Sequence, residues 1–135
     1  MYQKILLPVS VNQLDIAKTA LAAAKGLCDE GGEIIIINAH EPLPGPVAHY
    51  FSREDLIKRD KEIYDSLAKL AGDDSSLRIE LIVGRAGVAI VEYAEEHDID
   101  CIVIASHRPE LKDYLLGSTA SRVVRHSPCS VLVIR

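Results

Sequence analysis

Continuous apolar runs are the feature that most constrains how this chain can fold. Residues 34–37 are four consecutive isoleucines, and residues 5–9 and 102–105 are apolar throughout. A strand with one face in water alternates apolar and polar residues, whereas an unbroken run is typical of a strand covered on both faces. Because strands of that kind occur mainly in parallel sheets, the runs predict the buried centre of a parallel sheet.

Helical patterns, with apolar residues three or four positions apart, separate the runs. These patterns predict helices at residues 14–30, 53–71, 88–96 and 117–126. Residues 77–83 alternate apolar and charged side chains at first, which predicts a half-covered strand at a sheet edge. Residues 131–134 form a last apolar run and predict the final strand.

Several residues predict where the helices begin and end. Asn12 is the expected N-cap of the first helix, and Gly31-Gly32 is its expected end. Ser52 and Asp55 have the spacing of a helix start. Residues 41–46 contain three prolines, which predict a loop because proline cannot lie inside a helix or a central strand.

Strand and helix alternate along the whole chain, which predicts an α/β fold. The expected form is an open, doubly wound, five-stranded parallel sheet with helices on both faces. In such sheets a ligand binds beyond the carboxyl ends of the strands, where the strand order reverses. For the order 3-2-1-4-5 that point lies between strands one and four. The segments that would meet there are residues 8–10, 38–40, 105–108 and 117–119.

The segment Gly117-Ser118-Thr119 has two interpretations. It follows a strand and a polar loop and begins a helix, and a helix N-terminus offers backbone N–H groups and a favourable dipole to a phosphate. The same three residues also make an ordinary helix start. In the preceding loop, Arg108 is either a phosphate ligand or an exposed charge, and His107 is either a ligand contact or a loop histidine.

Length and charge exclude several classes of protein. The 135 residues predict one domain, residues 1–135, and the net charge of −5 offers no basic surface for nucleic acid. No run approaches the roughly 18 apolar residues that span a membrane, and the N-terminus is a poor signal peptide. We therefore expect a cytoplasmic protein with no membrane partner. Three widely spaced cysteines, Cys28, Cys101 and Cys129, argue against a disulfide framework and a zinc site.

Several stretches of this sequence resemble the universal stress protein family, over nearly the whole chain. They are residues 4–9, Gly84, residues 100–107, residues 115–118 and, as the most specific piece, residues 123–133. Ser-His-Arg-Pro followed by Tyr-Leu-Leu-Gly-Ser resembles one enterobacterial-type branch of the family. The resemblance implies the adenine nucleotide alpha hydrolase-like form of the fold.

The resemblance also implies a ligand, ATP, with AMP or ADP as weaker relatives and with room for Mg²⁺. Adenine would lie near Val9 and Ala39, and the phosphates would lie near Arg108 and residues 117–119. The residues that would bind the nucleotide are Pro8, Val9, Ser10, Ala39, Ile104, Ala105, Ser106, His107, Arg108, Gly117, Ser118 and Thr119. A homodimer formed through the final strand, residues 131–134, would cover an open sheet edge.

The chain departs from the family's nucleotide motif, which is Gly-x-x-Gly, nine residues, then Gly-Ser or Gly-Thr. Ala105 and Arg108 replace the first two glycines, eight residues separate Arg108 from Gly117, and Ser10 replaces the family's acid. Ser10 could touch the nucleoside or cap a turn. The sequence leaves open a stress-response sensor or switch that binds ATP, and a nucleotide-free dimeric interaction module.

A third hypothesis is a slow ATPase that phosphorylates itself on Ser118, Thr119 or Ser121. The sequence contains no Walker-type motif, which argues against fast turnover of ATP. A relative of the electron-transfer flavoprotein fold is a more distant alternative, and no flavin-specific residue supports it.

Overall fold

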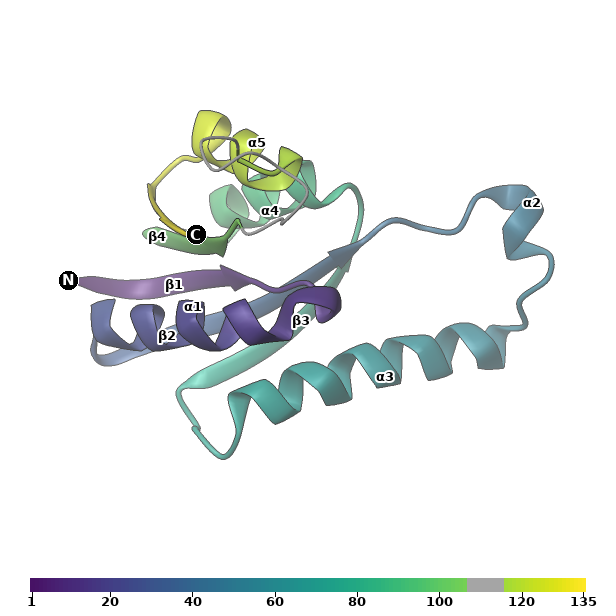
Figure 1. Cartoon of the computed structure of the whole chain (residues 1–135), viewed down its shortest axis with the longest axis horizontal. Coiled ribbons are helices and arrows are strands. Elements are labelled where there is room, and N and C mark those ends of the chain that lie inside the picture. The colour runs from purple at the N-terminus through teal and green to yellow at the C-terminus, as the bar shows by residue number, and fades with distance from the viewer. Residues whose placement is uncertain (107–115) are drawn as a thin grey trace.

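One five-stranded parallel sheet forms the centre of the molecule, in a computed structural model that describes residues 1–106 and 116–135 (Figure 1). Its strands are β1 (Tyr2–Pro8), β2 (Cys28–His40), β3 (Leu77–Val83), β4 (Cys101–Ala105) and β5 (Ser130–Ile134). They are ordered β3-β2-β1-β4-β5, and every neighbouring pair is parallel. The predicted fold class and strand order are confirmed, with β3 and β5 at the two edges.

Helices cover both faces of this sheet. They are α1 (Leu14–Leu27), α2 (Gly45–Ala48), α3 (Arg53–Ala71), α4 (Ala86–Glu96) and α5 (Ser118–His126), and a 3₁₀ turn, η1 (Val11–Gln13), precedes α1. In Figure 1, α1 and α3 lie on one side of the sheet and α4 and α5 on the other.

Successive residues of the central strands face opposite layers of helix. Ile5 and Leu7 pack with side chains of α1 and α3, and Leu6 packs with side chains of α4 and α5. The four isoleucines at 34–37 are divided in the same way, and none is more than 1% exposed. Burial on both faces explains why the runs are continuous in sequence.

The end of α1 differs from the prediction. The helix stops at Leu27, and Gly31-Gly32 lies inside β2, which begins at Cys28. The pairing of β1 with β2 shifts register in this part, and Gly31 has φ of +79°. The glycines therefore serve an irregular turn of the strand, because glycine adopts this left-handed conformation without strain.

Two other boundaries also differ. Asn12 is not an N-cap, since its backbone N–H donates to Ser10 Oγ at 3.4 Å at the start of η1. The proline-rich segment is not all loop, because α2 begins at Gly45 with Pro46 in its first turn. Proline is tolerated there because the first N–H groups of a helix have no intrahelical acceptor.

The start of α3 matches the sequence signature. Ser52 Oγ accepts from Asp55 N at 3.1 Å, and Asp55 Oδ2 accepts from Ser52 N at 3.0 Å. These two bonds form a complete capping box. The hydrogen bond from the Ser52 backbone also lowers the pKa of Asp55 below its ordinary value.

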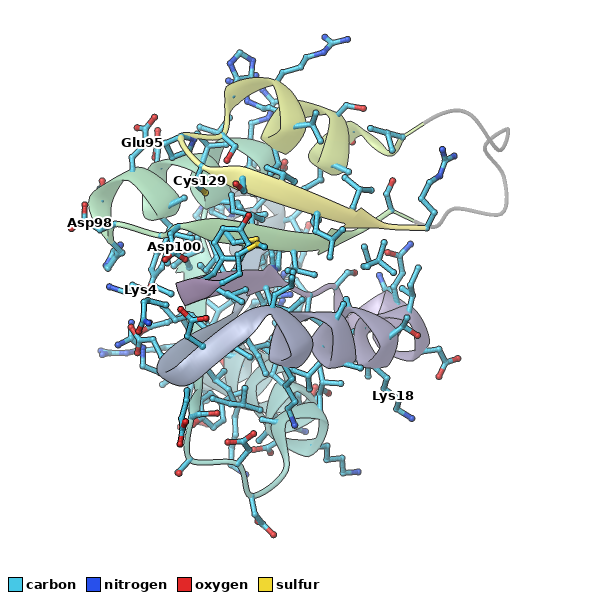
Figure 2. All side chains as sticks on the ribbon, turned by 90° about the vertical axis from the view of Figure 1, so that its left-hand side faces the viewer. Lys4, Lys18, Glu95, Asp98, Asp100 and Cys129 are labelled. Atoms are coloured by element: carbon cyan, nitrogen blue, oxygen red, sulfur yellow. The ribbon has the colours of Figure 1, made fainter. Side chains whose placement is uncertain are left out.

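Asp100 joins the amino ends of the two central strands β1 and β4. Its carboxylate accepts from Gln3 N at 2.9 Å and from Lys4 N at 3.0 Å, and its own N–H donates to Lys4 O at 3.0 Å. Figure 2 shows Lys4 and Asp100 together at this end of the sheet. These contacts fix the register of β1 and β4, and therefore the positions of their carboxyl ends.

The three cysteines are free thiols. Burial raises the pKa of Cys101 to about 11, which makes it a poor nucleophile at neutral pH. None of the helices in the described parts of the chain combines the length and the apolar character needed to cross a membrane.

Candidate functional site

A cavity of about 370 Å³ lies at the carboxyl ends of β1 and β4, the point where the strand order reverses. Its volume lies within the ~300–1,000 Å³ of small-molecule sites. The cavity is lined by Pro8, Val9, Ser10, Asn12, Gln13, Ala17, Ile37, Asn38, Ala39, Ala86, Ile90, Ile104, Ala105, Ser106, Gly117, Thr119 and Ala120.

This cavity brings together the predicted site residues that the structure describes, with one exception. Ser118 is exposed at the first position of α5 and is not part of the lining. His107 and Arg108 lie outside the described residues. The segments after β1, β2 and β4 and the start of α5 thus meet at one place, as the parallel topology predicts.

Most of the residues that the helices contribute were not predicted from the sequence. Asn12, Gln13 and Ala17 come from η1 and α1, and Ala86 and Ile90 come from α4. The parallel topology could have predicted them, because a helix that follows a parallel strand begins at the same edge of the sheet where that strand ends. Asn38 belongs to a predicted segment, but its own role could not be read from sequence.

Asn38 connects the ends of β1 and β2. Its Nδ2 donates to Val9 O at 2.9 Å, and Val9 N donates to Ile37 O at 2.9 Å. The residue is only 7% exposed, and its Oδ1 is buried without a hydrogen-bond partner among the residues that the structure describes. The backbone of Val9 is therefore fixed on the wall of the cavity, beside an acceptor that has no donor from the described chain.

Ser106 connects the end of β4 with the start of α5. Its N–H donates to Ile134 O at 2.7 Å, and its Oγ accepts from Gly117 N at 3.0 Å. Gly117 is the N-cap of α5, and as a glycine it has no side chain that could accept from the N–H groups after it. The next three N–H groups, of residues 118–120, have no acceptor within the helix, so the N-terminal end of α5 can bind an anion.

Two helices, α4 and α5, begin at this cavity, and in the described parts of the chain neither carries a side-chain cap, whereas α1 continues from η1, which Ser10 caps. The first turns of α4 and α5 also contain no acidic residue. By contrast α3, none of whose described residues lines the cavity, has a capping box and two acids in its first turn. The described lining side chains are all uncharged, so the positive ends of the helix dipoles dominate the local field and favour an anion.

Comparison with known proteins gives one family. The sequence model of the "Universal stress protein family" matches residues 1–135. "Universal stress protein G" of Salmonella typhimurium is 30% identical over an alignment of 145 residues, and the alignment covers 100% of each chain.

Two solved structures have the same fold. The structure of hypothetical protein MJ0577 superposes with a TM-score of 0.78 at 27% identity, covering 99% of this chain and 96% of the other. Universal stress protein UspA from Lactobacillus plantarum superposes with a TM-score of 0.72 at 26% identity, covering 99% of this chain and 98% of the other.

Proposed function

The chain belongs to the universal stress protein family, and from that premise and the geometry of the cavity at the switch point of its sheet we propose that it binds an adenine nucleotide, ATP. The observation that carries the proposal is the meeting of two uncapped helix N-termini, those of α4 and α5, at one neutral cavity on the switch point of the sheet, among the described residues. The protein would act as a stress-response sensor or switch, by changing its ligand occupancy.

The phosphates would bind at the start of α5. Backbone N–H groups of residues 118–120 point out of the helix, and the side chain of Thr119 lines the cavity. Ser106 already accepts from Gly117 N, so it holds the glycine close to the end of β4. Arg108, from outside the described residues, would add a guanidinium to the phosphates, as the sequence suggests.

The nucleoside would bind across the ends of β1 and β2. Pro8, Val9 and Ile104 offer apolar surface to the base, and the backbone of Ala39 would meet its polar edge. Ser10 lies where the family has an acid, and its hydroxyl accepts from Asn12 N at the long distance of 3.4 Å. That weak bond leaves the hydroxyl able to turn toward a ribose, which is the contact we propose for it.

Two solved structures of the same fold contain adenine nucleotides. One is a universal stress protein in complex with cAMP, at 24% identity and a TM-score of 0.66. The other is the universal stress protein from Archaeoglobus fulgidus in complex with dAMP, at 20% identity and a TM-score of 0.59. At these identities the likeness is one of fold, and it supports the proposal only by showing that the fold accommodates such a ligand.

Calorimetric titration of the purified protein with ATP and Mg²⁺ tests the proposal. We expect saturable binding and a rise in melting temperature, since ATP at a hundred times its Kd would stabilise the native state by about 2.7 kcal/mol. If neither heat nor a thermal shift is detected at millimolar ATP, the protein is instead a nucleotide-free interaction module.

We also propose a homodimer formed through β5. This strand is a sheet edge, paired in this chain with β4, and Leu132 on it is 36% exposed. Leu132→Lys is expected to convert the dimer to monomers in analytical ultracentrifugation, because a charge on an edge strand opposes pairing with a second edge. Val47→Lys, at an exposed apolar residue of α2, is the matched control and should leave the dimer unchanged. Dimers that persist in Leu132→Lys would place the interface elsewhere.

A further inference from the structure

An open groove of about 420 Å³ adjoins the nucleotide cavity, between the end of β2 and the helix α3. It is lined by Ser10, Val11, Asn38, Ala39, His40, Arg59, Glu62, Ile63 and Ser66. Ser10, Asn38 and Ala39 line both hollows, so the two lie side by side. Nothing in the proposed nucleotide pose uses the far part of this groove.

Two buried polar atoms on the lining of the groove lack hydrogen-bond partners among the described residues. They are Asn38 Oδ1 and His40 Nδ1. A buried polar atom without a partner is uncommon in native proteins and calls for an explanation. Asn38 is 7% exposed, and the side chain of His40 is 17% exposed. Two such atoms on one groove point to a ligand that satisfies both.

Asn38 Oδ1 is a hydrogen-bond acceptor, and His40 Nδ1 is one when the ring carries its proton on Nε2. The orientation of the Asn38 amide follows from its Nδ2, which donates to Val9 O. In the flipped orientation Oδ1 would face the Val9 carbonyl oxygen, and neither oxygen can donate. His40 Nε2 lies 3.6 Å from Asp60 Oδ1 on α3. A ring proton placed on Nε2 faces this carboxylate, and this is the arrangement that a ligand donating to Nδ1 requires. The ligand must therefore bring N–H or O–H donors.

The charges around the groove favour a positive donor. Glu62 and Asp60 supply two carboxylates, against the guanidinium of Arg59 on the same lining. The amino-terminal end of α3, which precedes the residues that line the groove, packs little against the rest of the described chain. Residues 53–58 are all exposed, and Figure 1 shows this half of α3 reaching beyond the sheet. Because the two acceptors are buried, binding requires the side chains that cover them to move aside.

We propose that the groove binds a primary ammonium group, whose N–H donors satisfy Asn38 Oδ1 and His40 Nδ1 and whose charge faces Glu62 and Asp60. The ligand is a small organic amine, bound either by itself or as a substituent on the base of a nucleotide in the adjoining cavity. Both sources share the chemistry of an alkylammonium head with several donors, and the second of them rests on the proposed nucleotide function.

Titration with 1,6-diaminohexane, followed by the NMR signals of the Asn38 side-chain amide and the His40 ring, tests the site. The matched probe is hexamethonium, which has the same chain and charge and no N–H donor. We expect saturable shifts with the diamine and binding of hexamethonium weaker by about tenfold, the effect of roughly one charged hydrogen bond. Equal binding of the two probes would overturn the proposal. It would also be overturned if neither probe caused a shift and an amine on the base of ATP had no effect on nucleotide binding.

Two variants locate the binding. His40→Phe keeps an aromatic ring and removes the acceptor. It is expected to weaken binding of the diamine about tenfold and to leave the affinity for ATP unchanged. Glu62→Gln changes an exposed residue of α3, so it keeps the test valid if His40→Phe does not fold. It is expected to weaken binding of the diamine several-fold. Unchanged affinity for the diamine in the folded variants would contradict the site.

The two sources are separated by N6-(6-aminohexyl)-ATP and N6-hexyl-ATP. Tighter binding of the amino compound than of the hexyl compound, lost in His40→Phe, assigns the groove to a base substituent. Binding of the free diamine without nucleotide assigns it to a separate amine. If unmodified ATP fails to bind while the diamine binds, the proposed nucleotide function falls and the amine site stands. If ATP binds and no amine has any effect, only the amine site falls.

Discussion

Gly117→Val is expected to abolish ATP binding while the protein keeps its fold. Gly117 is buried at the start of α5 and lines the cavity, so a valine there would add bulk next to the first N–H groups of the helix. Its φ of −62° and ψ of 159° are open to valine, so the backbone should not be strained. We expect Kd for ATP to rise at least about a hundredfold, a loss of ~2.7 kcal/mol.

The matched control for this substitution is Gly26→Val. Gly26 lies in the last turn of α1, and a Cβ added to it would meet no atom of the described residues within 4 Å. Calorimetry on both variants should show wild-type affinity for Gly26→Val alone. Equal affinity for ATP in Gly117→Val and the wild type would mean that the nucleotide binds at another place.

Asn38→Asp is expected to destabilise the protein strongly at neutral pH and little in acid. The new carboxylate would be buried against Val9 O, which now accepts a bond of 2.9 Å from Nδ2. Burial and this carbonyl both disfavour the charged form, so the pKa of the introduced carboxyl group should rise on folding above its unfolded value of about 3.9. In its protonated form the introduced carboxyl group could still donate to Val9 O.

The sign of the pH dependence follows from linkage. The native state of the variant would retain a proton that the unfolded state has released, so stability falls as pH rises above about 4. We expect a loss relative to wild type of about 3 kcal/mol at pH 7 and under ~1 kcal/mol at pH 4. Asn12→Asp makes the same change at an exposed residue and should cost little at either pH. Urea unfolding measures both, and a pH-independent loss in Asn38→Asp would show that Asn38 is not held as described.

The strands could be predicted from sequence because their signal is strong and local. The run of residues 34–37 is apolar on both faces, and only a covered strand of a parallel sheet needs such a sequence. The capping box at Ser52 was equally predictable, because both of its bonds lie within four residues. The prediction for Gly31-Gly32 was wrong, since a glycine pair ends a helix or bends a strand equally well, and the pairing of β1 with β2 decides between them.

The candidate site was predictable as far as topology determines it. The ends of β1, β2 and β4 meet because parallel strands end at one edge, so residues near Val9, Ala39 and Ala105 had to come together. Contacts between distant side chains were not predictable. The bond from Gly117 N to Ser106 Oγ and the unpartnered Asn38 Oδ1 in the described part of the chain depend on orientations that no sequence pattern specifies.

Mapping the amide NMR shifts of the full chain during titration with ATP tests the central claim most directly. That claim places the nucleotide in the cavity at the switch point of the sheet, with its phosphates at the start of α5. We expect the largest saturable shifts on residues 118–120, with a second group at Val9, Ser10 and Ala39. Saturable shifts confined to other parts of the chain, or no shifts at millimolar ATP, would contradict it.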